Sequence, residues 1–364
     1  MMQTIFTKEQ HWIDKWDVFV QSNSNGSYLQ LSDWAKSYTS YGFDYELCLF
    51  IKDETIIGGY CAVLAKVAFF KFYILPIGPL AINKEIKIIN DLITTLEQRA
   101  KDIKVCYCQI NIPFFDTNKI NLPCLNSFNS GHLFKYVFSL NGLNWIDLKA
   151  EDEESLIMQL KPSIRRNIRN SYRKGLDLKF MVSDSEIEKG YKLFKENSEV
   201  AKYSIREWKD MKQSLLNLNK KGYLKMLAAY KGEELKGCIL LLKAGNYYTY
   251  ILGGSKKEVP DLRTGDFLQW EAIKLSIKEQ CIGYNISLGG SKGVKEFKNS
   301  FNPKEILFDN SKYYKVINSF LFAFFLYFEK YMKPYKKSIA RVLSVFKKIS
   351  KCKLKIKIFG RKTT

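Results

Sequence analysis

The sequence predicts an α/β (α+β) protein built from two similar tandem domains, followed by a basic amphipathic C-terminal tail. Three observations support this prediction. The chain has 364 residues, 46% of them hydrophobic, which exceeds one ordinary domain and is enough for two cores. A succession of strands and a helix in the first half recurs in the second half. The formal net charge of +21 is concentrated near the C-terminus.

The repeated unit begins with a β-hairpin in each half. Residues 47–64 and 226–242 each contain two apolar runs joined by a short polar turn, which is typical of two antiparallel strands. Gly58 and Gly237 stand at the same point of the second strand and lie 179 positions apart. One offset shared by both hairpins indicates an internal duplication.

The unit continues in the same order in both halves. An aromatic strand precedes a helical pattern and a short closing strand, at 69–75, 84–102 and 105–110 in the first half and at 247–252, 262–280 and 284–288 in the second. We therefore expect a first domain over residues 1–150, a second domain over 151–310 and the tail over 311–364.

An Arg-rich helix is expected at the start of the second domain. Pro162 suits its first turn and Gly175 suits its C-terminal end. One face of this helix would carry a cation at every fourth residue: Lys161, Arg165, Arg169 and Arg173. Such a row is either an ordinary solvated surface or a face that binds an anion, because unpaired like charges repel one another. The sequence leaves both interpretations open.

The composition excludes several kinds of site. With His11 and His132 as the only histidines, a multi-histidine metal site is excluded and serine–histidine catalysis has little support. The eight cysteines show no zinc-binding spacing, and most lie in apolar runs, as expected of reduced, buried thiols. Residues 1–12 lack the apolar region of a signal peptide, and no apolar run is long enough to span a membrane. We expect a cytoplasmic protein with no bound metal.

The tail differs from the rest of the chain. Residues 311–364 contain 15 Lys or Arg and one acidic residue, Glu329, so they contribute +14 of the +21 net charge. An apolar run with five Phe, Val316–Phe328, precedes a stretch in which cationic and apolar residues alternate. This mixture is typical of a helix that lies on an anionic membrane surface. A basic arm that binds tRNA is the alternative. We expect peripheral attachment at the inner face of the plasma membrane.

Six short motifs stand in order over residues 10–310. They are Ser32-Asp33-Trp34-Ala35-Lys36, Pro76-Ile77-Gly78-Pro79, the Arg-rich segment from Lys161 to Gly175, Gly253-Gly254-Ser255, Leu268-Gln269-Trp270-Glu271-Ala272-Ile273, and the segment from Leu288 to Lys298. In this order they resemble the Fem family of peptidoglycan bridge-forming aminoacyltransferases. The tail lies outside the family pattern, and residues 182–223 are too short for the helical-hairpin arm of some members.

The resemblance implies two tandem domains of the GNAT (acetyltransferase-like) fold. It also implies an enzyme that moves an amino acid from aminoacyl-tRNA to an amine of a peptidoglycan precursor, either lipid II or a UDP-linked muropeptide. Aminoacyl-tRNA would then be a co-substrate, and no cofactor is expected. The oligomeric state is not indicated.

The resemblance also implies the site residues. Lys298, with its neighbour Phe297, would lie at the reaction centre, where a fixed cation stabilises the oxyanion of aminoacyl transfer. Gly289 and Gly290 would bring the backbone close to the substrate. An ordinary surface lysine beside a buried Phe is the alternative for this pair.

Four further residues are implied in substrate binding. Lys36, close to Trp34, and Arg206 from the second domain would hold the diphosphate of the precursor. Tyr250 would face the substrate, although core packing is the usual role of such a tyrosine. The cations Arg165, Arg169 and Arg173 would contact tRNA.

Two other functions remain open. One is an N-acyltransferase of the same fold that uses an acyl thioester on an envelope sugar or lipid. Residues 262–267 lack the glycine spacing that cradles the pyrophosphate of coenzyme A, which weakens this alternative. The other is a non-enzymatic basic protein that binds nucleic acid or membrane.

Overall fold

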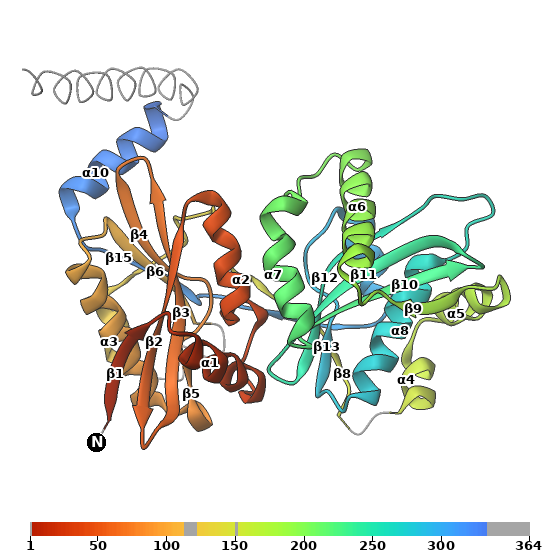
Figure 1. Cartoon of the computed structure of the whole chain (residues 1–364), viewed down its shortest axis with the longest axis horizontal. Helices are drawn as coiled ribbons and strands as arrows, with labels where there is room; N and C mark the ends of the chain where they lie inside the picture. Colours follow the sequence, from red (N-terminus) through yellow and green to blue (C-terminus); the bar gives the residue numbers. More distant parts are fainter. Residues whose placement is uncertain (1, 113–121, 150–151, 333–364) are drawn as a thin grey trace, which may run out of the picture.

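The computed structural model describes residues 2–112, 122–149 and 152–332, which form two α/β domains lying side by side (Figure 1). Each domain is one mixed sheet with helices on both faces. The prediction of two tandem α/β domains is confirmed.

The first sheet has the strand order β1-β2-β3-β4-β6-β15-β7, with the short β5 paired to β3. Its strands are β1 (Gln3–Thr7), β2 (Asp44–Lys52), β3 (Thr55–Val67), β4 (Phe70–Leu75), β5 (Leu80–Ala81), β6 (Tyr107–Asn111), β7 (Asn129–Ser130) and β15 (Lys312–Val316). One face packs on α1 (Gln10–Ser22) and α2 (Ser32–Lys36), and the other packs on α3 (Ile86–Asp102). The short helical turns are Tyr28–Gln30, Ser37–Tyr41, Ile82–Lys84 and Pro123–Ser127.

The second sheet has the order β14-β8-β13-β12-β11-β10-β9. Its strands are β8 (Gly142–Asp147), β9 (Asp177–Phe180), β10 (Leu224–Lys231), β11 (Glu234–Ala244), β12 (Tyr247–Ser255), β13 (Gly283–Asn285) and β14 (Lys304–Leu307). One face packs on α6 (Asp184–Val200) and α7 (Trp208–Lys220). The other packs on α4 (Glu153–Gln159), α5 (Pro162–Arg173) and α8 (Thr264–Lys278).

The duplicated hairpins agree in detail. Each contains a β-bulge beside the predicted glycine, with Ile57 and Lys236 as the extra residues. A Cβ on Gly58 would lie 2.7 Å from a side-chain carbon of Ile88 in α3, and a Cβ on Gly237 would lie 2.6 Å from one of Thr264 in α8. Both glycines therefore allow a helix to approach its sheet closely.

The domain boundaries differ from those expected, because each sheet takes one strand from the other half of the chain. β8 follows the first domain but pairs with β13 and β14 of the second sheet. β15 follows the second domain but pairs with β6 and β7 of the first sheet. The second domain therefore begins at about Gly142 rather than 151.

The tail also begins differently from the expectation. Residues 312–316 form an inner strand of the first sheet, and buried Ser311 donates to Oδ1 of Asn111. Helix α10 (Ser319–Tyr327) continues as a helical turn, Phe328–Met332, against the same domain (Figure 1). Residues 311–332 are thus part of the first domain rather than of a separate tail. The rest of the predicted amphipathic tail, residues 333–364, lies outside the described residues.

The two domains share one apolar cluster. Buried residues of α1 and α2 pack in the same cluster as buried residues of α6 and α7, and α2 lies beside α7 (Figure 1). Nζ of Lys221, just after α7, lies 2.8 Å from a carboxylate oxygen of Asp17 and 2.8 Å from one of Asp33, and both acids are buried. This interdomain contact is both apolar and ionic.

Candidate active site

The candidate site lies where two central strands of the second sheet diverge. β12 and β13 are parallel and pair only from Tyr247 opposite Gly283 to Thr249 opposite Asn285. Beyond this point β12 bulges at Ile251 and continues beside β11, whereas the backbone after Asn285 turns to β8, with Ile286 N donating to Asn144 O. No hydrogen bond joins residues 250–255 to residues 286–290, a part of the chain that the structure describes completely.

Lys298 lies at this divergence, in α9 (Lys292–Asn299), and is only 3% exposed. Its Nζ donates to Oγ of Ser287 at 2.7 Å and to the carbonyl of Gly289 at 2.6 Å. The same nitrogen lies 5.2 Å from the ring centroid of Tyr250. Among the described residues, no carboxylate lies within ion-pair distance of it.

The surroundings of Lys298 lower its pKa, so they favour the neutral amine more than water does. Burial, with a smaller contribution from the charge of Lys295, lowers the pKa of Lys298 to about 8. Near pH 7 the side chain is still mostly an ammonium group, held in place by two neutral acceptors. Lys298 is therefore a buried cation and not an ordinary surface lysine.

The loop before α9 explains the two glycines. Gly290 has φ +133°, and a Cβ there would lie 2.5 Å from a side-chain carbon of Val294, so no other residue fits without strain. Gly289 is exposed, its carbonyl accepts from Lys298, and a Cβ there would meet open space. Gly290 thus forms the turn, and Gly289 supplies a backbone contact to the lysine.

Phe297 packs inside the domain. Its ring makes an edge contact with Phe301 at 5.5 Å between centroids. It also lies so close to α8 that a Cβ on Gly265 would come within 3.3 Å of it. These contacts attach α9 to the start of α8, and they place Phe297 as a support for Lys298. A direct contact of Phe297 with substrate stays a prediction.

A buried polar layer beneath the site was not predicted from the sequence. Oδ1 of Asn285 accepts from the backbone N–H groups of Asn144 and Ser287, both at 3.0 Å. Ser287 is held at φ +63°, an uncommon value for a residue other than glycine. Asn285 therefore fixes the turn that presents Ser287 to Lys298. An asparagine inside a short buried strand, where asparagine is disfavoured, was the available signal.

The equivalent position of the first domain is closed by the chain itself. There β4 and β6 are the parallel pair, and beyond them the carbonyl of Asn111 accepts from Gly78 N at 2.9 Å. The Asn111 side chain donates to Oγ of Ser139 at 2.7 Å and to the carbonyl of Leu140 at 3.0 Å. Beside these bonds, no lysine is buried among the described residues of the first domain, in contrast to Lys298 in the second. The candidate reaction centre therefore belongs to the second domain.

The predicted diphosphate-binding residues lie together at the domain interface. Lys36 is exposed at the end of α2. The guanidinium of Arg206 donates to the backbone carbonyl of Ser37, to its Oγ at 2.6 Å and to Oγ of Ser40 at 3.1 Å. It also lies 4.6 Å from the ring centroid of Tyr41. The structure thus brings the two cations close in space, but Arg206 is already occupied in joining the domains.

Trp34 is mainly a core residue. It is 9% exposed and makes an edge contact with Tyr28 at 4.9 Å between ring centroids. Its contact with substrate, like the substrate contacts of Lys36 and Arg206, stays a prediction.

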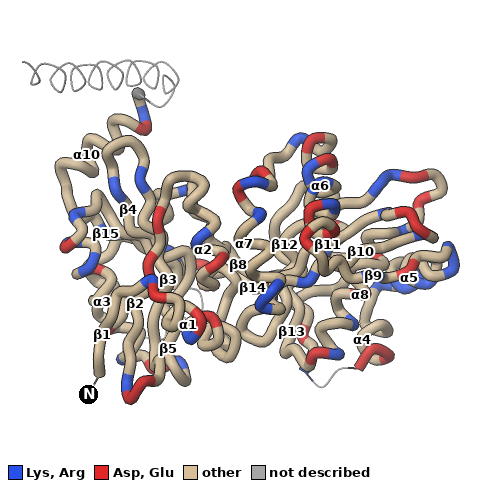
Figure 2. The backbone as a smooth tube through the Cα atoms, in the orientation of Figure 1, with Lys and Arg blue, Asp and Glu red and all other residues tan. Residues whose placement is uncertain are grey.

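Lys and Arg positions lie close together along α5 (Figure 2). Arg169 and Arg173 are exposed, and Arg165 is half-buried. Ile164 and Ile168 bury the opposite face of this helix against the apolar cluster that includes α8. A guanidinium nitrogen of Arg165 lies 3.1 Å from the sulfur of Met158. Within the described parts of the chain, no carboxylate pairs with Arg165, Arg169 or Arg173. This row is available to an external anion.

The start of α8 carries an acid. Asp266, in the first turn, is 6% exposed, and one of its carboxylate oxygens has no hydrogen-bond partner. Burial raises the pKa of Asp266 to about 6, although the charge of Arg263 opposes the shift. A carboxylate here repels an anionic ligand and offsets the attraction of the helix N-terminus for one.

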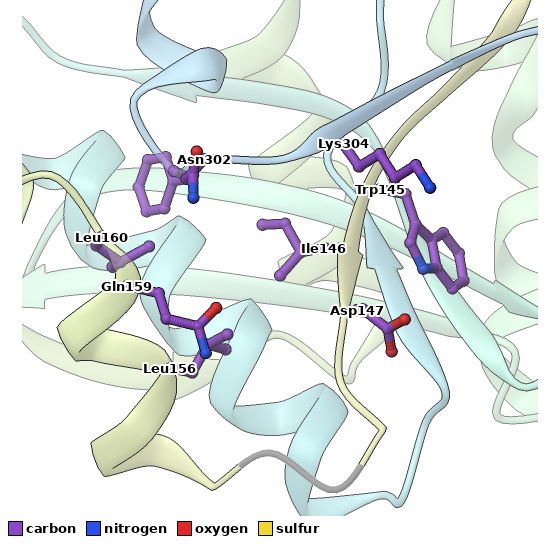
Figure 3. Close-up of a pocket in the computed structure, with 9 residues that line it drawn as sticks. Trp145, Ile146, Asp147, Leu156, Gln159, Leu160, Asn302 and Lys304 are labelled. Atoms are coloured by element: carbon purple, nitrogen blue, oxygen red, sulfur yellow. The ribbon is translucent and has the colours of Figure 1, made fainter.

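A cavity of about 190 Å³ lies between α4, the edge strand β14 and its neighbour β8 (Figure 3). Its lining includes Trp145, Asp147, Gln159, Asn302 and Lys304. It does not include Lys298 or Tyr250, and none of the predicted site residues lines it. This cavity is therefore separate from the candidate reaction centre.

Comparison with known proteins agrees with this architecture. Residues 161–299 match the model of an acetyltransferase (GNAT) domain. The crystal structure of FemX superposes with a TM-score of 0.74 and 15% sequence identity, covering 88% of this chain and 99% of FemX. The chain therefore has the GNAT fold, and this fold is similar to that of FemX. The prediction of that fold is confirmed, and the matched domain confirms an acyltransferase as the class of enzyme.

A second solved structure supports the same fold. A conserved protein of unknown function from Bacteroides thetaiotaomicron superposes with a TM-score of 0.57 and 12% identity, covering 87% of this chain and 100% of that one. No curated protein matches the sequence.

The described residues contain neither a cluster of metal ligands nor a membrane-spanning helix. No group of three or more His, Cys, Asp or Glu side chains is placed to bind a metal ion there. Within the same residues, no helix is long and apolar enough to cross a bilayer.

Proposed function

We propose that this Fem-like acyltransferase moves an aminoacyl group from aminoacyl-tRNA to an amine of a peptidoglycan precursor, either lipid II or a UDP-linked muropeptide. The observation that supports the proposal is Lys298, a buried cation with neutral partners beside a tyrosine. Burial without a counterion is costly for stability, so a chemical role accounts for it better than a structural one.

The reaction follows from this geometry. The acceptor amine attacks the ester carbonyl of the aminoacyl group and forms the new C–N bond and a tetrahedral oxyanion. The Lys298 ammonium stabilises this oxyanion, a contribution of roughly 3–4 kcal/mol for one well-placed donor. Collapse breaks the ester C–O bond, and the proton lost by the amine is balanced by the one gained by the departing ribose hydroxyl. The ester is already activated, so a strong protein base is not needed.

The surrounding residues would orient the lysine and the substrates. Ser287 and Gly289 hold Nζ from one side, and the ring of Tyr250 limits its movement on another. Lys36 at the interface would contact the diphosphate of the precursor, with Arg206 fixing the adjacent turn or joining in the contact. The exposed cations of α5 would contact the phosphates of the tRNA acceptor end.

A second candidate is an N-acyltransferase that uses an acyl thioester. The match of residues 161–299 to an acetyltransferase domain favours it. Asp266 at the first turn of α8 argues against a coenzyme A pyrophosphate at that helix end.

The test supplies the purified full chain with labelled aminoacyl-tRNA or labelled acetyl-CoA, and with lipid II or a UDP-linked muropeptide. We expect label from aminoacyl-tRNA in the precursor, and a rate reduced roughly 100- to 1000-fold in Lys298→Ala. Lys292→Ala is the matched control, because Lys292 begins the same helix and is exposed. Transfer from acetyl-CoA alone would establish the second candidate. Equal rates for both variants would exclude Lys298 from the chemistry.

A further inference from the structure

Exposed aromatic side chains gather at one end of the first domain. Phe69, at the tip of the β3–β4 hairpin, is 56% exposed and stacks on Phe324 of α10 at 5.4 Å between centroids. Phe320, Tyr327 and Tyr331 are also exposed, Phe320 to 80%. We call these five residues the aromatic face. Helix α10 lies beside this hairpin at the end of the domain that faces away from α5 (Figure 1).

Four of the five residues of the aromatic face lie on one side of α10 and the turn after it, and the other side of this helix packs in the core. Positions 320, 324, 327 and 331 follow helical spacing along one side of α10 and the turn after it. On the opposite side, Phe325 is buried against Phe70, Phe72 and Tyr107. The inner stripe holds the helix on the domain, so the outer stripe is not needed for folding. Large exposed apolar patches usually mark interaction sites.

The charges around the face are mainly positive, and Glu329 is the one acid of residues 311–332. Lys66 and Lys71 are exposed on the two strands of the hairpin, and Lys330 lies 5.0 Å from the ring centroid of Tyr331. The chain leaves this face at Met332 and continues with 32 residues that contain 12 Lys or Arg and no Asp or Glu. An apolar aromatic surface bordered by cations is complementary to an anionic lipid headgroup layer.

We propose that the aromatic face inserts into the headgroup layer of an anionic membrane. Phenylalanine and tyrosine rings suit this layer because their apolar bodies are buried there while the tyrosine hydroxyls reach water. The proposal assigns membrane contact to folded residues of the first domain. It does not depend on the substrate of the enzyme.

The test measures sedimentation of the full chain with phosphatidylcholine vesicles that contain or lack phosphatidylglycerol. The double variant Phe69→Ser/Phe320→Ser should lower binding to the anionic vesicles by about tenfold. Both side chains are more than half exposed, so the variant should unfold at an unchanged temperature. Phe180→Ser is the matched control, because Phe180 is an exposed phenylalanine on edge strand β9 of the second domain. Its binding should equal that of the wild type.

Three outcomes would overturn the proposal. Wild-type binding by the double variant would show that the aromatic face does not touch the lipid. Binding to tRNA with no binding to anionic vesicles would make this region a nucleic-acid surface. A wild-type dimer that the double variant converts to a monomer, without vesicle binding, would show that a second copy covers the face.

Discussion

Lys298 is the residue at which stability and function conflict. Its neighbours are two neutral acceptors and an aromatic ring, so nothing among the described residues neutralises the charge that burial makes costly. From the resemblance we expected Lys298 in the site, together with the two glycines before it and Tyr250. The resemblance did not indicate Asn285 and Ser287. These residues act on Lys298 through the shape of a backbone turn, and the sequence pattern does not reveal that turn.

The protonation state of Lys298 should appear in the pH dependence of the rate. Only the ammonium form can stabilise an oxyanion, and its pKa is lowered to about 8. We therefore expect kcat to fall as the pH rises through about 8. Lys298→Arg stays protonated throughout, so its residual activity should lack this fall. A rate that rises through pH 8 in the wild type, with the rise lost in Lys298→Arg, would instead make Lys298 a general base.

Removing the charge should stabilise the protein near pH 7. The folded state lowers the lysine pKa from 10.5 to about 8, so the wild type gains stability as the pH rises between these values. That gain in the free energy of unfolding corresponds to roughly 3 kcal/mol. A methionine cannot make the two hydrogen bonds of Lys298, and their loss offsets part of it. Lys298→Met should raise the free energy of unfolding at pH 7 by about 1–2 kcal/mol and lose this advantage by about pH 10. Urea unfolding at pH 7 and pH 10 measures this difference in the free energy of unfolding. A variant less stable than the wild type at pH 7 would contradict the prediction.

At the scale of elements, the repeated units were predictable because local patterns define them. Both hairpins, the two helices α3 and α8 and the Arg-rich α5 appear close to the expected positions. β8 and β15 were missed as strands of the opposite sheet, since each is short and its partner is distant in sequence. The Phe run of residues 316–328 was interpreted as a membrane segment, although half of its helix packs in the core.

The loop of residues 285–290 offers a matched pair of substitutions. Gly290→Ala should destabilise the protein by about 1–3 kcal/mol, because the backbone has φ +133° and the new Cβ would clash with Val294. It should also lower kcat by displacing the carbonyl that holds Lys298. Gly289→Ala should unfold like the wild type, since its Cβ would meet open space. Thermal unfolding and rates of both variants test this, and equal stability of the two would refute it.

At the scale of the whole molecule, the two domains behave as one body. They share an apolar cluster, exchange strands in both directions and place Lys221 between two buried acids. None of these contacts was predictable from either half alone, because each depends on how the halves meet. The expected start of a separate tail at residue 311 was wrong for the same reason, because β15 lies inside the first sheet.

The ionic contact should contribute strongly to stability. Lys221→Met would leave Asp17 and Asp33 buried without a cation, a loss of about 3–5 kcal/mol at pH 7. Burial already raises the pKa of Asp17. Loss of the lysine raises the pKa of Asp17 further, so the deficit should shrink as the pH falls toward 5 and Asp17 is protonated. Urea unfolding at pH 7 and pH 5 gives both values. Lys220→Met, at an exposed neighbour, is the control, and an equal small loss in both variants would disprove the role of Lys221.

The exchange of strands has a consequence for synthesis on the ribosome. Strand β6 emerges with the first domain, but its neighbour β15 is translated about 200 residues later, which takes about 10–40 s at 5–20 residues per second. In the mature fold β6 is a buried strand with a neighbour on each side. During that interval one of its edges is still free, and free strand edges promote aggregation. The nascent chain therefore depends on protection of that edge, by a chaperone or by its own partial structure, until the last strand arrives.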